Sequence, residues 1–462
     1  MDKDYCALLK KYNFKAIVEF VSKNQNIDEP KQGAFFIGAV SIASTSEHPL
    51  NQDTMIKVLH DSSIYSQNKN GRKTISVDEM REICKKRNSL NFPNDIKYEK
   101  EKGFGTVFAI AKKQSISKIG ESLSAAFQRD YYIFTAIDCI LKSTPHKFLA
   151  SQAYYQKLFE SDMITGFAMI LLFYTECFEK KKCMFMPPFS KYESFFIEKF
   201  GDYVTYDHGL SKEFVPYRHC LVKIGKTYYI PLLGALYNRL SHLLYWHLKD
   251  ELKENNIFPN RFGEYFEEYI DNFLKHTVSD NYVRIDKETD KQNGPKRPDF
   301  EINKFDHSFI IECKSRLISL DDINKKLYSG HFREETLEGI EQLKQYKPEQ
   351  NNSIRMLVLY EDNFPMIEFY EQAIRQYSKA NEQYWIVTID EFEALMDLKT
   401  KEDFDKVIVR KMKFQSNKKP ISLSMAMSDC GVGKQYSNFC LAHIEKLVNK
   451  KAKEIIKFYN GI

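Results

Sequence analysis

The sequence lacks the features that mark membrane and secreted proteins. No apolar run is long enough to cross a bilayer: the longest, Met163 to Thr175, is closed by Glu176, and we expect a buried helix there. The first residues show no positively charged region followed by an apolar stretch, so no secretory signal is predicted. The nine cysteines are odd in number and scattered, which favours a reducing cytoplasm over a disulfide-stabilised fold.

A strong excess of one charge is also missing. The chain has 68 Lys+Arg against 63 Asp+Glu, and its formal net charge of +5 is weak evidence for a nucleic-acid partner. Its 43% hydrophobic and 28% charged residues are ordinary for a globular protein and exclude a disordered, collagen-like or membrane-embedded chain. At roughly 100–200 residues per domain, 462 residues suggest about two to four domains.

The pattern of elements divides the chain into four regions. Residues 1–215 read as mostly helical, with a capping box at Ser76 and Glu79, and we expect them to serve recognition, sensing or partner binding. Residues 216–255 are expected to form a β-hairpin and a connecting helix, the helix covering about 232–254. Residues 256–400 read as an α/β region, and residues 401–462 as a short helical C-terminal extension.

The third region has a specific order of elements. A helix is predicted first, then three strands, a helix and a strand, which gives αβββαβ, with another helix and strand appended. The predicted ranges are a helix over 261–275, strands at 282–285, 298–302 and 309–314, a helix over 334–346, a strand at 354–360, a helix over 366–380 and a strand at 384–388.

Two acids and a lysine fall on the predicted hairpin of this region. Glu312 and Lys314 project from one face of their strand and Cys313 from the other, because side chains alternate with a period of two. Asp299 opens the partner strand and can lie beside Glu312. Two neighbouring carboxylates repel each other, and a divalent cation such as Mg²⁺, which takes one or two carboxylates, relieves that cost. The alternative is an ordinary salt bridge on an α/β domain.

A third acid comes from the upstream helix. Phe262, Phe266 and Phe273 belong to its core-facing stripe. Glu267 lies at the edge of that stripe, so we expect it to lean towards the strand carboxylates.

Together these residues resemble a known superfamily. The pieces are Gly263-x-x-Phe266-Glu267, Pro298-Asp299, Glu312-x-Lys314 and, further on, Gln342-Leu-Lys-Gln-Tyr346. Their order in an αβββαβ frame resembles the PD-(D/E)xK nucleases, and the last piece is similar to the Q-x-x-x-Y helix motif of the RecB-like branch. The resemblance implies an α+β or α/β multi-domain protein whose C-terminal core has the restriction-endonuclease-like fold.

The resemblance also implies roles for the acids and the lysine. Asp299 and Glu312 would ligate Mg²⁺ or Mn²⁺ with help from the Cys313 carbonyl, and Glu267 would hold a second metal or an outer water. Lys314 would orient and help to deprotonate the attacking water and stabilise the charge of the transition state.

Four further residues are expected to act on the substrate. Gln342 and Tyr346 would position the active-site face or contact the nucleic-acid backbone, by the same resemblance. Lys296 and Arg297 stand immediately before Asp299, where a phosphate must pass in any productive complex.

The sequence therefore predicts a cytoplasmic, Mg²⁺-dependent endonuclease that acts on nucleic acid, most simply double-stranded DNA. A catalytic third attached to a large unrelated half suggests bacterial restriction or anti-phage defence by analogy. A homodimer or a partner protein of a defence system fits duplex cleavage, and no membrane partner is expected. One alternative is an RNA-cleaving toxin of the tRNA-cutting kind. The other is a non-catalytic nucleic-acid-binding or scaffold protein on a nuclease fold.

Overall fold

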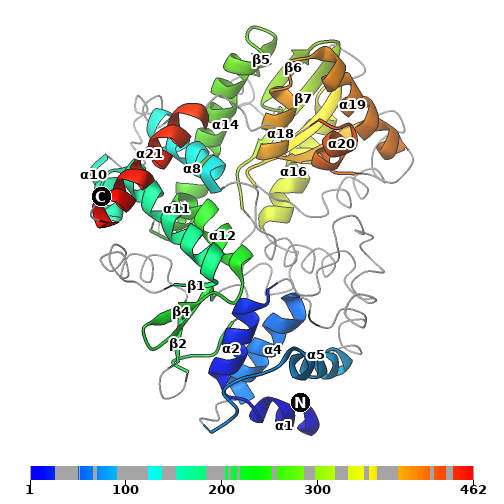
Figure 1. The fold of residues 1–462 in the computed structure, drawn as a ribbon. Helices are drawn as coiled ribbons and strands as arrows, with labels where there is room; N and C mark the ends of the chain where they lie inside the picture. The colour runs from blue at the N-terminus through cyan, green and yellow to red at the C-terminus, as the bar shows by residue number, and fades with distance from the viewer. Residues whose placement is uncertain are drawn as a thin grey trace.

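The structure is a computed structural model of the whole chain (Figure 1). It describes residues 2–25, 50, 52–65, 70–90, 123–137, 152–183, 203–206, 210–215, 219–251, 257–285, 297–317, 331–347, 353–361, 383–416, 421–432 and 441–460. Within these ranges the protein combines many helices with two mixed sheets, which defines an α+β protein.

The N-terminal region is mostly helical where it is described, as predicted. Its helices are α1 (Lys3–Lys10), α2 (Phe14–Lys23), α4 (Gln52–Tyr65), α5 (Val77–Leu90), α8 (Leu123–Tyr132), the π-helix η1 (Ile133–Ile137), α10 (Gln152–Phe159) and α11 (Met163–Lys180). The predicted capping box is present at the start of α5: the Ser76 amide donates to Glu79 Oε2 across 2.8 Å, and the Glu79 amide donates to Ser76 Oγ across 3.2 Å.

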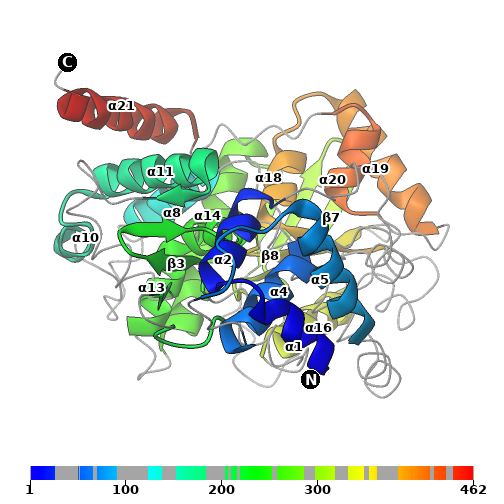
Figure 2. The same cartoon turned by 60° about the horizontal axis from the view of Figure 1, so that its bottom comes forward.

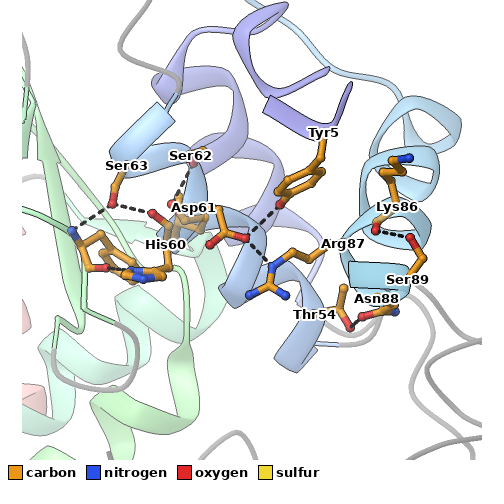
Figure 3. A network of polar contacts seen from close by, with 12 residues as sticks. Tyr5, Thr54, His60, Asp61, Ser62, Ser63, Lys86, Arg87, Asn88 and Ser89 are labelled. Atoms are coloured by element: carbon orange, nitrogen blue, oxygen red, sulfur yellow. Dashed lines mark hydrogen bonds and ion pairs between the residues drawn. The ribbon is translucent and has the colours of Figure 1, made fainter. Parts of the chain in front are cut away.

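A buried polar network joins three of these helices (Figure 3). Asp61 on α4 accepts hydrogen bonds from the Tyr5 hydroxyl of α1, at 3.0 Å, and from Arg87 of α5. The residue before Asp61 is His60, whose Nδ1 lies 2.7 Å from the Phe214 carbonyl oxygen, so α4 also contacts the segment that precedes the hairpin. Charged groups at low exposure need such partners, and here they fix the angles between helices.

The long apolar run forms a core helix, as predicted. Phe167, Ile170 and Phe173 of α11 are buried, and the helix packs against α8, α12 (Leu233–Ser241) and α21 (Leu441–Asn460). Among the described helices, one segment, Gln156–Lys180, is long and apolar enough to cross a membrane by length and composition. In the protein 56% of its apolar window is buried, as is usual for a helix of a protein core.

The predicted hairpin belongs to a larger sheet. Strands β3 (Leu221–Ile224) and β4 (Thr227–Tyr229) pair antiparallel around Gly225, whose φ of +61° suits a glycine. Strands β1 (Lys182–Cys183) and β2 (Tyr203–Tyr206) join them in the order β1-β4-β3-β2. This sheet therefore takes strands from both sides of residue 215; the proposed region boundaries stay a prediction.

The prediction of one continuous helix over 232–254 was wrong, because this segment forms two helices. α12 ends at Ser241 and α13 (Leu243–Glu251) begins at once, with His242 between them at φ −122° and ψ 32°. The apolar spacing continues across the break, so the sequence pattern alone reads as one helix. The turn at His242 lets its buried ring and that of Tyr245 reach Tyr360, at centroid distances of 5.6 and 6.1 Å.

The third region contains a five-stranded sheet. Its elements are α14 (Ile257–Thr277), β5 (Tyr282–Arg284), β6 (Phe300–Lys304), β7 (His307–Lys314), α16 (His331–Gln345), β8 (Ile354–Leu359) and β9 (Tyr384–Thr388). The strand order is β5-β6-β7-β8-β9; the first three strands are antiparallel, and β7, β8 and β9 are parallel. The predicted strands and helices of this region are thus confirmed, except the helix expected over 366–380, which lies outside the described residues.

The last helices have two locations. α18 (Ile389–Met396), α19 (Lys401–Ser416) and α20 (Leu423–Asp429) lie beside the five-stranded sheet (Figure 1). The C-terminal helix α21 instead returns to the N-terminal region and packs along α11 and α8, as both ribbon views show (Figures 1 and 2). The C-terminal extension is therefore helical, as predicted, and it connects distant parts of the chain.

Candidate active site

The β6–β7 hairpin places the first acid. Phe300 pairs with Ile311, so Asp299, one position before Phe300, lies across from Glu312. The Asp299 amide donates to the Ile311 carbonyl across 2.8 Å, and its Oδ2 accepts a 2.6 Å hydrogen bond from the Cys313 amide. Only 2% of Asp299 is exposed. The backbone of β7 thus holds this carboxylate in a fixed position, as the sequence predicted.

Glu312 and Lys314 lie on the same face of β7. The apolar residues that precede them bury the strand between two layers, so their side chains emerge near the end of a rigid element. Lys314 Nζ lies 2.8 Å from Glu312 Oε1, and the Glu312 carboxylate is 2% exposed. Asp299 also acts electrostatically on Lys314. The three residues of the predicted site therefore meet at one place.

Lys314 carries a proton in this arrangement. Burial works against the charged ammonium and by itself lowers the pKa of Lys314. The nearby carboxylates of Glu312, Asp299 and Glu338 outweigh burial, with Glu312 first, and the resulting pKa of Lys314 is raised above its ordinary value. Lys314 is therefore a hydrogen-bond donor and a positive charge in this site. The general-base part of its predicted role has no support from this pKa.

Helix α16 covers this face of the sheet with the predicted Gln and Tyr. Lys314 Nζ donates a 2.9 Å hydrogen bond to Gln342 Oε1. One helical turn later, the Tyr346 hydroxyl donates to Glu301 Oε2 across 3.2 Å. Glu301 lies on β6, on the same strand face as Asp299. Gln342 thus contacts the candidate catalytic lysine, and Tyr346 anchors the helix on the neighbouring strand.

Two α16 residues near the site were missed by the sequence reasoning. A Cβ placed on Gly339 would lie 3.0 Å from Lys314 Cε and 3.3 Å from Glu312 Cγ. The missing side chain therefore lets the helix approach β7 closely. Glu338, beside it, adds negative charge near Lys314. The available signal was the spacing of Gly339, Gln342 and Tyr346, which lie along one helix face.

Glu267 is the third acid of the predicted site. It lies on α14 and acts electrostatically on Arg284 of β5, and Arg284 also contacts Glu268 across 2.7 Å. Arg284 pairs with Phe300, on the strand that Asp299 precedes. Within the described ranges, no group of three or more His, Cys, Asp or Glu side chains is arranged to hold a metal. The structure thus brings together Asp299 and Glu312, and the role of Glu267 as a further ligand stays a prediction.

The remaining predicted residues contribute less to this geometry. The Cys313 side chain is buried, on the strand face opposite Lys314, and the residue serves the site through its amide. Arg297 is exposed just before Asp299, where a phosphate could reach it. Lys296 lies outside the described residues.

The acid pair has the chemistry to hold a hard cation. One oxygen of each carboxylate has a partner: Asp299 Oδ2 accepts from the Cys313 amide, and Glu312 Oε1 contacts Lys314. The second oxygens, Asp299 Oδ1 and Glu312 Oε2, are buried and take no part in these two contacts. Mg²⁺ accepts one or two carboxylates and fills its other positions with water or substrate oxygens. These two residues therefore fit Mg²⁺ or Mn²⁺ as ligands.

Comparisons with known proteins add no relative to this picture. The chain matches no protein-family model, no curated protein and no solved structure.

Proposed function

We propose that the protein is a metal-dependent nuclease that hydrolyses phosphodiester bonds, most simply as a DNA endonuclease. One observation carries this proposal. The Lys314 ammonium lies 2.8 Å from Glu312 and 2.9 Å from Gln342, beside the buried Asp299, at one end of an αβββαβ unit. Two acids can hold a divalent cation and a lysine can stabilise negative charge, which are tasks that metal-assisted phosphoryl hydrolysis uses.

In this proposal each residue has a limited task. Asp299 and Glu312 hold the divalent cation, which when bound supplies a Lewis acid for the phosphoryl oxygen and lowers the pKa of a water. Lys314 donates a hydrogen bond to the water or phosphate and stabilises negative charge in the transition state. Gln342 fixes the direction of the Lys314 ammonium. Arg297 is placed to contact the backbone of the nucleic acid as it enters.

A substrate panel tests the proposal. Wild type is incubated with Mg²⁺ or Mn²⁺ and plasmid, linear duplex, single-stranded DNA or RNA, beside Lys314→Ala. Lys347→Ala removes an exposed lysine just after α16 and is the matched control. We expect cleavage by wild type and the control, and none by Lys314→Ala. Equal cleavage by Lys314→Ala excludes the assignment. Cleavage of RNA alone favours the toxin alternative over the DNA endonuclease.

Metal binding separates an enzyme from a scaffold. Calorimetric titration with Mn²⁺ should show binding to wild type that is lost in Asp299→Asn. If the protein binds nucleic acid but does not bind Mn²⁺, the non-catalytic alternative is favoured. Mn²⁺ binding without turnover instead indicates an enzyme that waits for a trigger or partner, as defence nucleases of bacteria would in the cytoplasm.

A further inference from the structure

Tyr360 is bonded to the backbone of the candidate catalytic lysine. It follows β8, whose last residue Leu359 pairs with Lys314 in the parallel register. The Tyr360 amide donates to the Lys314 carbonyl oxygen across 3.0 Å. Tyr360 therefore extends the ladder by one hydrogen bond at the end of β7, where the Lys314 side chain emerges.

The side chain of Tyr360 reaches the N-terminal region. Its hydroxyl donates a 2.9 Å hydrogen bond to Asp130 Oδ1 on α8, and both residues are 1% exposed. Its ring is enclosed by the rings of Phe262 and Phe266 of α14, at centroid distances of 4.8 and 5.2 Å. Because aromatic packing fixes the ring, a displacement of its hydroxyl is passed to its backbone amide.

The residue before Asp130 binds the helix that follows the next strand, β9. Arg129 makes 3.1 Å contacts with Glu393 of α18 and also pairs with Asp390. Helix α18 begins directly after β9. Two consecutive residues of α8 thus bond to the sheet region: Asp130 to the residue that follows β8, and Arg129 to the helix that follows β9. Both strands are parallel to β7, and β8 pairs directly with it.

We propose that Tyr360 is a positioning residue for Lys314, and that the hydrogen bond between Asp130 and Tyr360 couples α8 to the candidate active site. The inference rests on the proposed function for the catalytic importance of Lys314. A shift of α8, from binding in the N-terminal region, moves Tyr360 and with it the Lys314 backbone. Catalytic groups tolerate little displacement, because a misplacement of about 1 Å can cost on the order of a hundredfold in rate.

Two tyrosine variants test the coupling. Tyr360→Phe removes only the hydroxyl and keeps the ring packed. Tyr5→Phe is the matched control: its buried hydroxyl donates a 3.0 Å hydrogen bond to Asp61, in the polar network of α1, α4 and α5. We expect kcat for cleavage to fall on the order of tenfold in Tyr360→Phe, with KM within about twofold of wild type. Tyr5→Phe should keep kcat at similar thermal stability. An equal kcat in the two variants overturns the proposal.

A double-mutant cycle identifies the route. If the bond transmits the effect, Asp130→Leu, which removes the acceptor, and Tyr360→Phe lower kcat by similar factors, and the double variant is no worse than either alone. Multiplying factors instead show that the two residues act independently, which overturns the coupling.

A spectroscopic signal keeps the test independent of cleavage. In protein labelled with ¹³Cε-lysine, the Lys314 signal is assigned by its loss in Lys314→Arg. It should move in Tyr360→Phe and Asp130→Leu and stay in place in Tyr5→Phe; a signal unmoved in all three refutes the coupling. If the signal moves but wild type neither binds Mn²⁺ nor cleaves nucleic acid, the proposed function fails and the coupling stands.

Discussion

The Lys314 ammonium donates a 2.9 Å hydrogen bond to Gln342 Oε1, which joins β7 to α16 at the candidate site. Because Glu312 holds the same ammonium from its own strand, the lysine is fixed from two directions. An ammonium held by two acceptors points its remaining hydrogen in a defined direction, which a charge on a free flexible stem does not.

The first prediction concerns this contact. Gln342→Leu keeps the approximate size of the side chain and removes the oxygen that accepts the Lys314 hydrogen bond. Lys314 then keeps only the contact with Glu312, and its ammonium can take more orientations. We expect cleavage to fall by about 10- to 100-fold, as is usual for groups that orient a metal site. Gln345→Leu, on the exposed side of α16, is the control and should leave activity intact. A fully active Gln342→Leu enzyme contradicts the orienting role.

The second prediction concerns the close approach of α16. A Cβ at Gly339 would come within 2.7 Å of Leu357 Cδ1 and 3.0 Å of Lys314 Cε. Gly339→Ala should therefore cost about 1–3 kcal/mol of unfolding free energy and reduce cleavage as well. Gly263→Ala, in α14, meets only Ser315 Oγ at 3.7 Å and should be neutral or stabilising by about 0.5–1 kcal/mol. Urea unfolding of both variants checks the contrast; equal stabilities would show that α16 has room at Gly339.

The third prediction concerns pH. Lys304 is buried and donates to the Met396 carbonyl across 2.6 Å; burial, followed by repulsion from Lys399, lowers its pKa to about 8. Between pH 8 and 10.5 the unfolded chain binds this proton more tightly than the folded protein, so the stability contributed here rises with pH in that window. We expect a rise of about 2–3 kcal/mol in wild type relative to Lys304→Met. Parallel pH–stability curves for the two proteins would contradict this.

The fourth prediction concerns the buried charges between α8 and α18. Arg129→Met leaves Asp390 and Glu393 without their guanidinium, and an uncompensated buried charge costs about 3–5 kcal/mol. Arg410→Met breaks the partly exposed pair with Asp429 and should cost at most about 1 kcal/mol. Thermal unfolding of the two variants should separate them clearly. Similar losses would mean that the buried pair adds little to the interface.

Local patterns in the sequence were enough to predict much of the third region. The apolar run before Glu312 predicted a buried strand, and the period of two placed Glu312 and Lys314 on one face. The same rule and a short turn placed Asp299 on the partner strand. These features depend on neighbouring residues along the chain, and hydrogen bonding in a hairpin leaves few alternatives.

Other features were decided by contacts between distant segments. Glu267 lies at the edge of its helix stripe, and only the pairing of β5 with β6 brings Arg284 to it. The break at His242 interrupts an apolar pattern that would suit one helix. Gly339 matters because α16 lies close against β7 and β8 at this position.

The sequence by itself determined the order of elements and the faces of the strands, because these follow from side-chain periodicity and backbone geometry. Only the tertiary structure decided that Arg284 lies near Glu267, how closely α16 approaches Lys314, and that Asp130 of α8 bonds to Tyr360. Those outcomes depend on the packing of residues far apart in the chain, because small differences in distance determine which side chains contact each other.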